Sequence, residues 1–298
     1  MKNYAQFDLH LHSHWSYDAF SNVEDYFKLA RQKKVRAFAL TDHHTMDGYG
    51  DMLKIAPNYP DVYFIAGGEL TVHSPLGTFD LVCLGLPCRE TPELAELFKT
   101  YRAWQVAYGS AISANLVRLG FQFGDDERMK VLQSYRPQRV IDKQGCTHVQ
   151  AMKMQQTMIE LGFVKNELEW VQLRAKFEDL PKYPEFDYVV PKVKAAGGVV
   201  IIAHPYGYFH KTDLARMDAL RELLQLDGIE CAHPSTPEDI TPFYREYCAK
   251  HGMLSSGGSD SHQPCTVHDN HHLTDIEFAF HCAKPEWLDE ILERVQLH

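Results

Sequence analysis

Short apolar runs in this chain are repeatedly followed by residues that can bind metal ions. Six such runs lead to these residues: Asp8, His10 and His12; Asp42, His43 and His44; Glu69; His204; His233; and Asp260 and His262. Apolar runs of this length are typical of buried strands in a parallel sheet. Because the chemistry of parallel barrels lies at the carboxyl ends of the strands, we expect these side chains to meet at one rim.

The first run carries a His-x-His pair. His10 and His12 lie two residues apart in a segment that we expect to be extended, so their side chains leave the same face. They can therefore bind one metal ion together. Asp18 follows in a polar turn, from which its carboxylate could reach a neighbouring ion.

The next two runs supply an imidazole and a carboxylate. After the run 35–40, His43 is the better-placed ligand and His44 the weaker one. Glu69 follows Gly67 and Gly68 at an expected strand end, where glycines let the backbone approach a crowded site. A carboxylate can bridge two ions, so Glu69 is the natural centre of a cluster with several metals.

The later runs complete the set. His204 ends the apolar run 199–203, and Asp260 and His262 repeat the two-residue spacing after two glycines. Two residues at the end of the run 229–232 are expected to face substrate or to support the ligands: Glu230 and His233. Histidine mixed with carboxylates, without cysteine, indicates Zn²⁺, Mn²⁺, Fe or Mg²⁺.

Composition limits the classes of function. The 298 residues are 45% hydrophobic and 23% charged, as in globular proteins, and the net charge is −10. That charge argues against an extended grip on duplex nucleic acid, but a small phosphorylated substrate or short oligonucleotide remains compatible. No run reaches a membrane span of about 20 residues, and no signal peptide is recognisable. The seven scattered cysteines contain no C-x-x-C pair, which favours reduced thiols and a cytoplasmic protein.

Strand and helix patterns alternate in two parts of the chain, which predicts an α/β fold. Strands are predicted over residues 7–11, 35–40, 62–66, 81–86, 199–203, 228–231, 253–256 and 276–280. Helices are predicted over residues 23–34, 49–56, 188–196, 213–224, 237–251 and 285–295. Between 88 and 187 the alternation stops, and helical patterns cover 94–119, 147–161 and 167–177. We expect a barrel formed by 1–87 and 188–298, interrupted by a helical insertion over 88–187.

These residues resemble the PHP (polymerase and histidinol phosphatase) family of metal-dependent phosphoesterases. The matching pieces occur in the family's order: residues 8–12 with Asp18, 41–43 with Thr45 and Gly48, Gly68 with Glu69, 202–205, and 258–262. The resemblance implies a distorted seven-stranded (β/α) TIM-like barrel with a trinuclear metal centre at its rim.

The resemblance also implies a ligand set. One ion would be held by His10, His12, Glu69 and Asp260, and a second by Asp18, His43 and His262. Glu69 and His204 would hold the third ion. The family's remaining histidine has no counterpart in residues 77–80, so His73 or Asp80 is expected to replace it. His44 is a second departure, because a related subgroup usually has Asp there.

The helical insertion resembles that of a subgroup that acts on nucleotides and short RNA, where it serves as a substrate cap. His148, in Gly145-Cys146-Thr147-His148, is similar to the subgroup's Gly-Arg-Pro-His motif but lacks the Arg and Pro. We expect His148 to contact substrate. Arg102 and Arg136 are the candidate phosphate contacts.

The predicted activity is hydrolysis of a phosphate ester, with two or three divalent ions activating a hydroxide for in-line attack. Glu69 would fix the spacing of the ions. Either a metal-bound water would protonate the leaving group, or His204 or His233 would do so. Of the possible substrates, we favour a nucleotide or a short oligonucleotide, because of the helical insertion. The alternatives are a histidinol-phosphate phosphatase, an amidohydrolase-type C–N hydrolase, whose carboxylated strand-end lysine has no counterpart here, and a non-catalytic metal-binding module. The sequence makes no prediction of oligomeric state.

Overall fold

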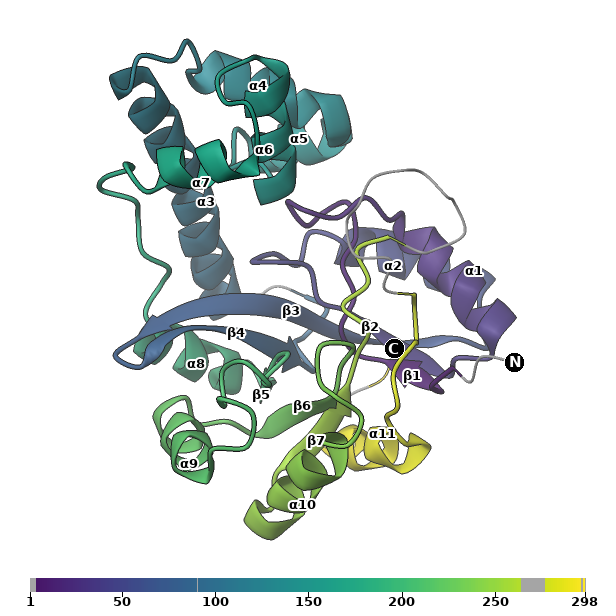
Figure 1. The fold of residues 1–298 in the computed structure, drawn as a ribbon. Helices are drawn as coiled ribbons and strands as arrows, with labels where there is room; N and C mark the ends of the chain where they lie inside the picture. Colours follow the sequence, from purple (N-terminus) through teal and green to yellow (C-terminus); the bar gives the residue numbers. More distant parts are fainter. Residues whose placement is uncertain (1–3, 90, 264–276, 296, 298) are drawn as a thin grey trace. The chain divides into compact units, whose positions relative to one another are not determined.

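The computed structural model describes residues 4–89, 91–263, 277–295 and 297. Its contacts divide the chain into two compact units. We call residues 1–98 with 184–298 the sheet unit, and residues 99–183 the helical unit. Figure 1 follows the chain through both units by colour.

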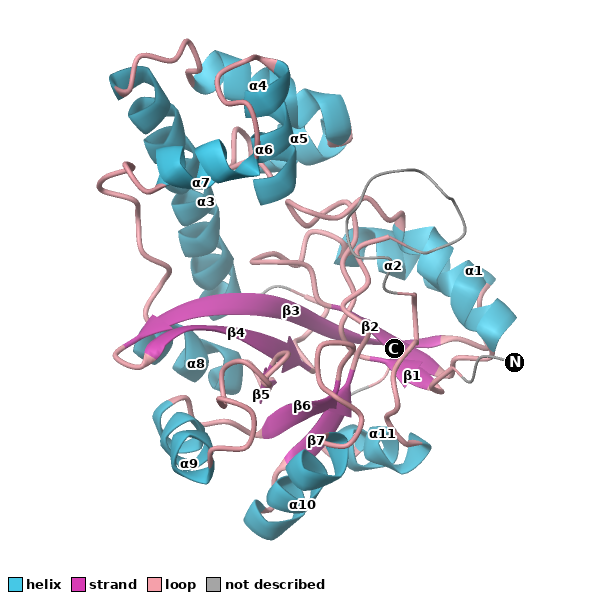
Figure 2. Ribbon diagram, viewed as in Figure 1, coloured by secondary structure: helices cyan, strands magenta, loops and turns pink. Residues whose placement is uncertain are grey.

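The sheet unit contains seven strands that neighbour one another in chain order. They are β1 (Phe7–Asp8), β2 (Ala37–Leu40), β3 (Tyr63–Ser74), β4 (Gly77–Leu84), β5 (Val199–Ile202), β6 (Gly228–Ala232) and β7 (Leu254–Gly257). The pairs β1–β2, β2–β3, β5–β6 and β6–β7 are parallel. Figure 2 shows β3 and β4 as the longest strands of the sheet.

Strand β4 departs from the parallel arrangement predicted from the sequence. It runs antiparallel to both β3 and β5. Ser74 pairs with Gly77, so residues 75 and 76 alone connect β3 to β4. A two-residue connection can join antiparallel strands but not parallel ones, which need a crossover of a dozen residues or more. The expectation that every strand is parallel was therefore wrong at β4.

The predicted α/β class and the seven strands implied by the family resemblance are confirmed, whereas closure of the sheet into a barrel is not. Among the described residues, β1 and β7 form no ladder with each other. Isolated contacts link the segments that follow them: the Leu9 N–H donates to the Gly257 carbonyl (3.1 Å), and Leu11 and Ser261 form a single parallel bridge.

The sheet unit also contains helices, which connect or follow its strands. They are α1 (Val23–Lys33), α2 (Tyr49–Ile55), the 3₁₀ helix η1 (Ala56–Asn58), α8 (Phe186–Ala195), α9 (Leu214–Leu223), α10 (Thr241–His251) and α11 (Pro285–Leu292). The side chains that α1 buries recur at helical spacing, and its Phe27 ring meets Phe38 of β2 edge-on at 4.9 Å. α10 and α11 pack against β6 and β7 (Figure 1).

The helix α3 (Pro92–Arg118) begins in the sheet unit and continues into the helical unit. There it is followed by α4 (Asp125–Tyr135), α5 (Gln138–Gln144), α6 (Ala151–Glu160) and α7 (Glu167–Arg174). This unit has an apolar core of its own, which includes Leu116, Phe123, Leu132, Met158 and Trp170. None of the helices in the described residues is both long and apolar enough to cross a membrane.

Two local predictions failed. The helices α4 and α5 were not expected from the sequence. The predicted strand over residues 276–280 is wrong in its described part, because residues 277–280 form a turn in which Ala279 has a φ of 61°. Ile276 lies outside the described residues.

Candidate metal centre

The sequence analysis placed Glu69 at the end of a strand. In the structure it lies inside strand β3. The strand continues to Ser74 because β3 pairs with β4 beyond the point where β2 stops. Beside the end of β2, the Glu69 N–H donates to the Thr41 carbonyl (3.1 Å) and the His44 N–H donates to the Glu69 carbonyl (2.9 Å). These bonds fix the backbone of Glu69, so its carboxylate has a defined direction.

The carboxylate of Glu69 meets four imidazoles. Its Oε2 lies 3.1 Å from His10 Nε2, 3.3 Å from His12 Nε2 and 3.2 Å from His43 Nδ1. Its Oε1 lies 3.1 Å from His204 Nε2. Glu69 is 1% exposed, so these contacts are made away from solvent. The side chain occupies the centre of the predicted cluster.

Around Glu69, the predicted ligands gather in three overlapping groups whose ligand atoms lie within 4.8 Å of one another. The first group is His10, His12, Glu69 and Asp260. The second group is His12, Asp18, His43 and His262. The third group is Glu69, Asp80 and His204. The first two contain the sets expected from the sequence, with His12 added to the second.

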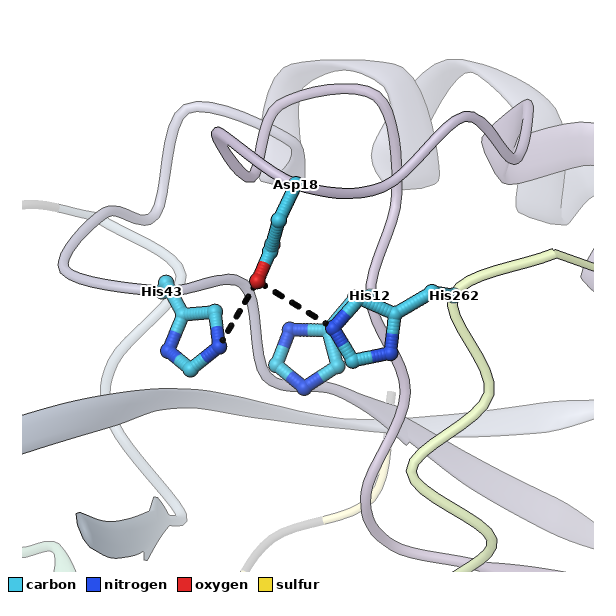
Figure 3. Close-up of side chains that lie close together, drawn as sticks. All are labelled: His12, Asp18, His43 and His262. Atoms are coloured by element: carbon cyan, nitrogen blue, oxygen red, sulfur yellow. Dashed lines mark ion pairs between the residues drawn. The ribbon is translucent and has the colours of Figure 1, made fainter. Parts of the chain in front are cut away.

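Figure 3 shows the second group, in which Asp18 points between two imidazoles. Its Oδ2 lies 3.3 Å from His43 Nε2 and 3.4 Å from His262 Nε2. The other ring nitrogen of His262 lies 2.8 Å from the Asp260 carbonyl oxygen, to which it can only donate. His262 Nε2 is therefore the nitrogen left to bind an ion.

The third group contains Asp80 and not His73. Asp80 Oδ2 lies 3.8 Å from His204 Nε2, and its carboxylate accepts hydrogen bonds from Thr71 (2.6 Å) and Tyr208 (2.7 Å). His73 instead pairs with Glu185 (3.0 Å). Four residues of extended strand separate His73 from Glu69, roughly 13 Å at 3.3 Å per residue, which is too far to share an ion.

The donor atoms fit divalent cations. Several buried ring nitrogens make no hydrogen bond, although three of them lie at ion-pair distance from Glu69: His10 Nε2, both nitrogens of His12, and His43 Nδ1. Buried polar atoms are normally hydrogen-bonded, so such a concentration fits the binding of cations. Imidazoles and carboxylates without thiolate suit Mn²⁺, Zn²⁺, Fe²⁺ or Mg²⁺.

The charges of the cluster balance one another in the ion-free protein. Burial alone would lower the pKa of His43, His204 and His262, but the facing carboxylates raise these pKa values to about 10, 9 and 9. Burial would raise the pKa of Glu69 and Asp18, but the adjacent imidazolium charges hold both pKa values well below the usual range. An arriving cation must therefore displace protons.

Two ligands adopt a left-handed backbone. His204 has a φ of 31° and Asp260 a φ of 55°. Such conformations cost on the order of 1–3 kcal/mol for residues other than glycine, and they persist where the surroundings impose them. Here the Asp260 N–H donates to the His10 carbonyl (2.9 Å), and the His204 N–H donates to Glu230 Oε2 (2.6 Å). The strained backbone therefore lies at two of the predicted ligands, His204 and Asp260.

His233 lies beside the first group. Its Nε2 is 3.6 Å from Asp260 Oδ2. The backbone N–H of Ser235 donates to His233 Nδ1 (3.0 Å), so a neutral His233 carries its proton on Nε2. This arrangement favours a proton donor over a metal ligand.

Residues that support the ligands were largely missed by sequence reasoning. Ser13 donates both its backbone N–H (2.6 Å) and its hydroxyl (2.9 Å) to the buried carboxylate of Asp42. Thr71 and Tyr208 fix Asp80 in the same way. Single serines, threonines and tyrosines carry no spacing signal. The only sequence hint was that Ser13 directly follows His12.

The predicted substrate contacts lie in the helical unit. His148 is buried, with the rings of Trp104 and Tyr108 each 5.5 Å away. Arg136 is also buried and donates to Thr147 (3.1 Å). Arg102 donates to the Lys143 carbonyl (3.2 Å), so all three border the segment 143–148. Their contact with substrate stays a prediction.

Known proteins resemble this chain over most of its length. It is 28% identical over 272 residues to the 3′,5′-nucleoside bisphosphate phosphatase of Chromobacterium violaceum, covering 87% of this chain and 88% of the relative. It is 22% identical over 271 residues to a 5′-3′ exoribonuclease of Haemophilus influenzae, covering 87% of this chain and 91% of that protein.

Two solved structures share the fold. One, from Bifidobacterium adolescentis, is described as a candidate metal-dependent phosphoesterase; it superposes with a TM-score of 0.71 at 20% identity and covers 97% of this chain and 96% of that one. The other, described as an amidohydrolase from Chromobacterium violaceum with bound sulfate, has a TM-score of 0.70 at 23% identity and covers 98% of both chains. Residues 8–178, more than half of the chain, match the PHP domain, and the chain therefore belongs to the PHP-domain family of metal-dependent phosphoesterases.

Proposed function

We propose that this protein hydrolyses a phosphate ester of a nucleotide or a short oligonucleotide, using two or three divalent ions. The observation that carries the proposal is the set of three groups of candidate ligands, in which His12 links the first to the second and Glu69 links the first to the third. Two ions a few ångströms apart are the usual means of binding a phosphoryl group while activating water. When bound, the ions would lower the pKa of the attacking water and neutralise charge on the phosphoryl oxygens.

Glu69 would set the distance between the ions. Its Oε2 faces the imidazoles of the first and second groups, and its Oε1 faces His204 of the third. Because pairing with β4 on one side and the bonds to the end of β2 on the other hold its backbone, the carboxylate projects from a fixed point of the sheet. Glu69 thus orients the ligands, and the transfer of protons is the role of other residues.

We assign protonation of the leaving group to His233. Its Nε2 carries the proton in the neutral ring, as the Ser235 N–H contact requires, and it lies at the edge of the first group. His204 was the other candidate from the sequence. His204 Nε2 lies 3.1 Å from Glu69 within the third group, so its position suits a metal ligand better.

The nucleotide preference is supported by two relatives that each cover 87% of this chain and are named for a nucleoside bisphosphate and for RNA. Within this proposal, Arg136, His148 and Arg102 of the helical unit bind phosphate or base, and the helical unit serves as the substrate cap. Histidinol phosphate is the alternative substrate, and amide hydrolysis is the alternative reaction. Among the described residues of the sheet unit, no contact favours either alternative specifically.

The test is hydrolysis by metal-stripped protein, with Mn²⁺, Zn²⁺, Fe²⁺ or Mg²⁺ added back singly. The substrates are a nucleoside 3′,5′-bisphosphate, a 5′-phosphorylated short RNA, histidinol phosphate and an N-acyl amino acid. We expect no turnover without metal, recovery on add-back, and the highest kcat/KM on the nucleotides. Glu69→Gln should abolish turnover, whereas His73→Gln, on the same strand but outside the three groups, should retain it. Turnover that survives chelation, or faster hydrolysis of histidinol phosphate or the amide, would overturn the proposal.

A further inference from the structure

Glu230 contacts two predicted ligands from different groups. It lies in β6, is 1% exposed, and has its two oxygens directed at different residues. Oε1 lies 3.0 Å from His10 Nδ1, and Oε2 accepts the backbone N–H of His204 at 2.6 Å. One buried carboxylate therefore joins a side chain of the first group to the backbone of the third.

The contact with His10 determines which ring nitrogen can bind an ion. His10 Nε2 points to the first group, 3.1 Å from Glu69 Oε2 and 3.5 Å from Asp260 Oδ1. A carboxylate oxygen at Nδ1 requires a proton there, because a carboxylate can only accept. The neutral ring then has a bare Nε2 that faces the cluster, which is the tautomer a metal needs.

The contact with His204 supports its strained backbone. β5 ends at Ile202, and the register pairs Ile202 with Ile229, so Glu230 comes next on the neighbouring strand. At this point His204 turns into a left-handed conformation with a φ of 31°. The bond from its N–H to Glu230 Oε2 replaces the ladder bond that the turn interrupts. The direction of the His204 imidazole thus depends on Glu230.

Gly258 provides the space for this arrangement. A Cβ atom at this position would lie 2.3 Å from His10 Cβ and 2.9 Å from Glu230 Oε1. Any other residue at position 258 would push Glu230 Oε1 away from His10 Nδ1. The glycine therefore serves a close approach of side chains and not an unusual turn.

Glu230 could instead be read as a metal ligand, because His10, Glu230 and His233 also have ligand atoms within 4.8 Å. The hydrogen bonds argue against this. Both oxygens of Glu230 already face N–H donors, and an ion there would compete for His10 Nδ1 while Nε2 serves the first group. His233 Nδ1 is occupied by the Ser235 N–H as well.

We infer that Glu230 is a positioning residue shared by the first and third groups: one oxygen sets the tautomer of His10 and the other fixes the backbone of His204. The inference rests on the proposed function only in requiring that these groups bind ions. It assigns Glu230 no contact with the substrate or the ions.

The decisive experiment compares Glu230→Gln with Asp227→Asn. Asp227 precedes β6 and accepts the Val200 N–H (2.9 Å) and the Lys194 ammonium (2.8 Å), so it makes the same kind of bond without belonging to any of the ligand groups. Zinc-loaded proteins with ¹⁵N-labelled histidine are examined by NMR for the tautomer of His10. Metal affinity is measured by competition with a chromophoric chelator, and stability by denaturant unfolding.

In wild type and Asp227→Asn we expect His10 with its proton on Nδ1 and zinc on Nε2. In Glu230→Gln the amide cannot accept from both N–H groups, so we expect that signature to be lost and zinc affinity to fall about 10–100-fold. Asp227→Asn should lose stability but keep its zinc affinity. Unchanged tautomer and affinity in Glu230→Gln would overturn the inference.

If Glu230→Gln does not fold, the NMR spectra of the wild type alone test the inference. Zinc bound through Nδ1 of His10 in the wild type would contradict it without any variant. The two proposals can also fail separately. If the wild type binds zinc with a Glu230-dependent His10 tautomer but hydrolyses none of the phosphate esters, the proposed function falls and this inference stands.

Discussion

The carboxylate of Asp8 accepts two hydrogen bonds from Ser259, one from the backbone N–H at 2.9 Å and one from the hydroxyl at 2.6 Å. Asp42 and Ser13 repeat the arrangement at 2.6 and 2.9 Å. All four side chains are buried, and each serine is the chain neighbour of a residue in the first group. The segment after β1 is thus tied on one side to the end of β7 and on the other to the end of β2.

Ser259→Ala removes one of these bonds and leaves the backbone N–H in place. Because the lost hydroxyl served a buried carboxylate, we expect the free energy of unfolding to fall by about 1–3 kcal/mol. Affinity for metal should weaken as well, since Asp260 is the next residue. Ser134→Ala, which removes an exposed hydroxyl that donates to the Val131 carbonyl (2.6 Å), is the control and should change neither quantity. Equal denaturant midpoints and metal affinities for the two variants would contradict the prediction.

Gly258→Ala should damage the metal centre through steric overlap. The added methyl would lie 2.3 Å from His10 Cβ and 2.7 Å from the His10 backbone nitrogen, so the two segments must separate. Overpacking of this kind typically costs about 1–3 kcal/mol of stability, and it should lower the metal content after reconstitution. Gly207→Ala, whose methyl would meet nothing within 4 Å, is the matched control. Metal analysis and thermal unfolding of both variants test the prediction; a fully loaded, equally stable Gly258→Ala would refute it.

Stability of the ion-free protein should fall as the pH rises above 6.5. Facing carboxylates overcome the effect of burial and raise the pKa values of His43, His204 and His262 to about 10, 9 and 9, against 6.5 for an unperturbed histidine. A group with a raised pKa stabilises the fold fully below its unfolded pKa, and this contribution is lost as the pH rises through the folded pKa. The loss should therefore extend from about pH 6.5 to pH 10.

Metal should abolish this dependence, because bound imidazoles carry no proton on the ligating nitrogen. Denaturant unfolding at pH 6.5, 8 and 9.5, with and without chelator, measures both effects. Metal binding at pH 8 should also release protons, detectable by calorimetry in buffers of different ionisation enthalpy. Chelated protein that is as stable at pH 9.5 as at pH 6.5 would show that these ion pairs do not exist.

His233→Gln should affect the chemical step and leave metal content unchanged. If His233 protonates the leaving group, kcat on a nucleoside phosphate should fall about 10²–10⁴-fold. Hydrolysis of p-nitrophenyl phosphate should fall far less, because its leaving group needs no proton. Ser235→Ala retains the backbone N–H that sets the tautomer and should have little effect. Equal losses on both substrates would remove His233 from this role.

The side chains that gather at the strand ends could be predicted as candidate ligands because an apolar run followed by imidazole or carboxylate is a local pattern. His10, His12, Asp260 and His204 needed no knowledge of the tertiary fold. The position of Glu69 within β3 could not be predicted, because it depends on pairing with β4. The same pairing puts Asp80 opposite Thr71, two residues from Glu69, and leaves His73 further along the strand. Register between strands is a tertiary property that single-strand patterns do not encode.

The helices α4 and α5 were missed for a local reason. In α4 the buried positions are Arg128 and Leu132, and a buried arginine breaks the apolar period that indicates a helix. Arg128 is accommodated because it donates to Ser113 (2.6 Å) and Asp125 (2.6 Å). The helix α5 spans seven residues, which is too short for a clear period. The supporting bonds of the metal centre escaped prediction because they join residues distant in the chain.

His12 and Glu69 each belong to two of the three groups, and this sharing affects how the protein binds its cations. The first cation to bind fixes a residue that its neighbour also needs and adds positive charge beside it, so successive loading steps are thermodynamically linked. A metal titration should therefore depart from the curve of independent sites.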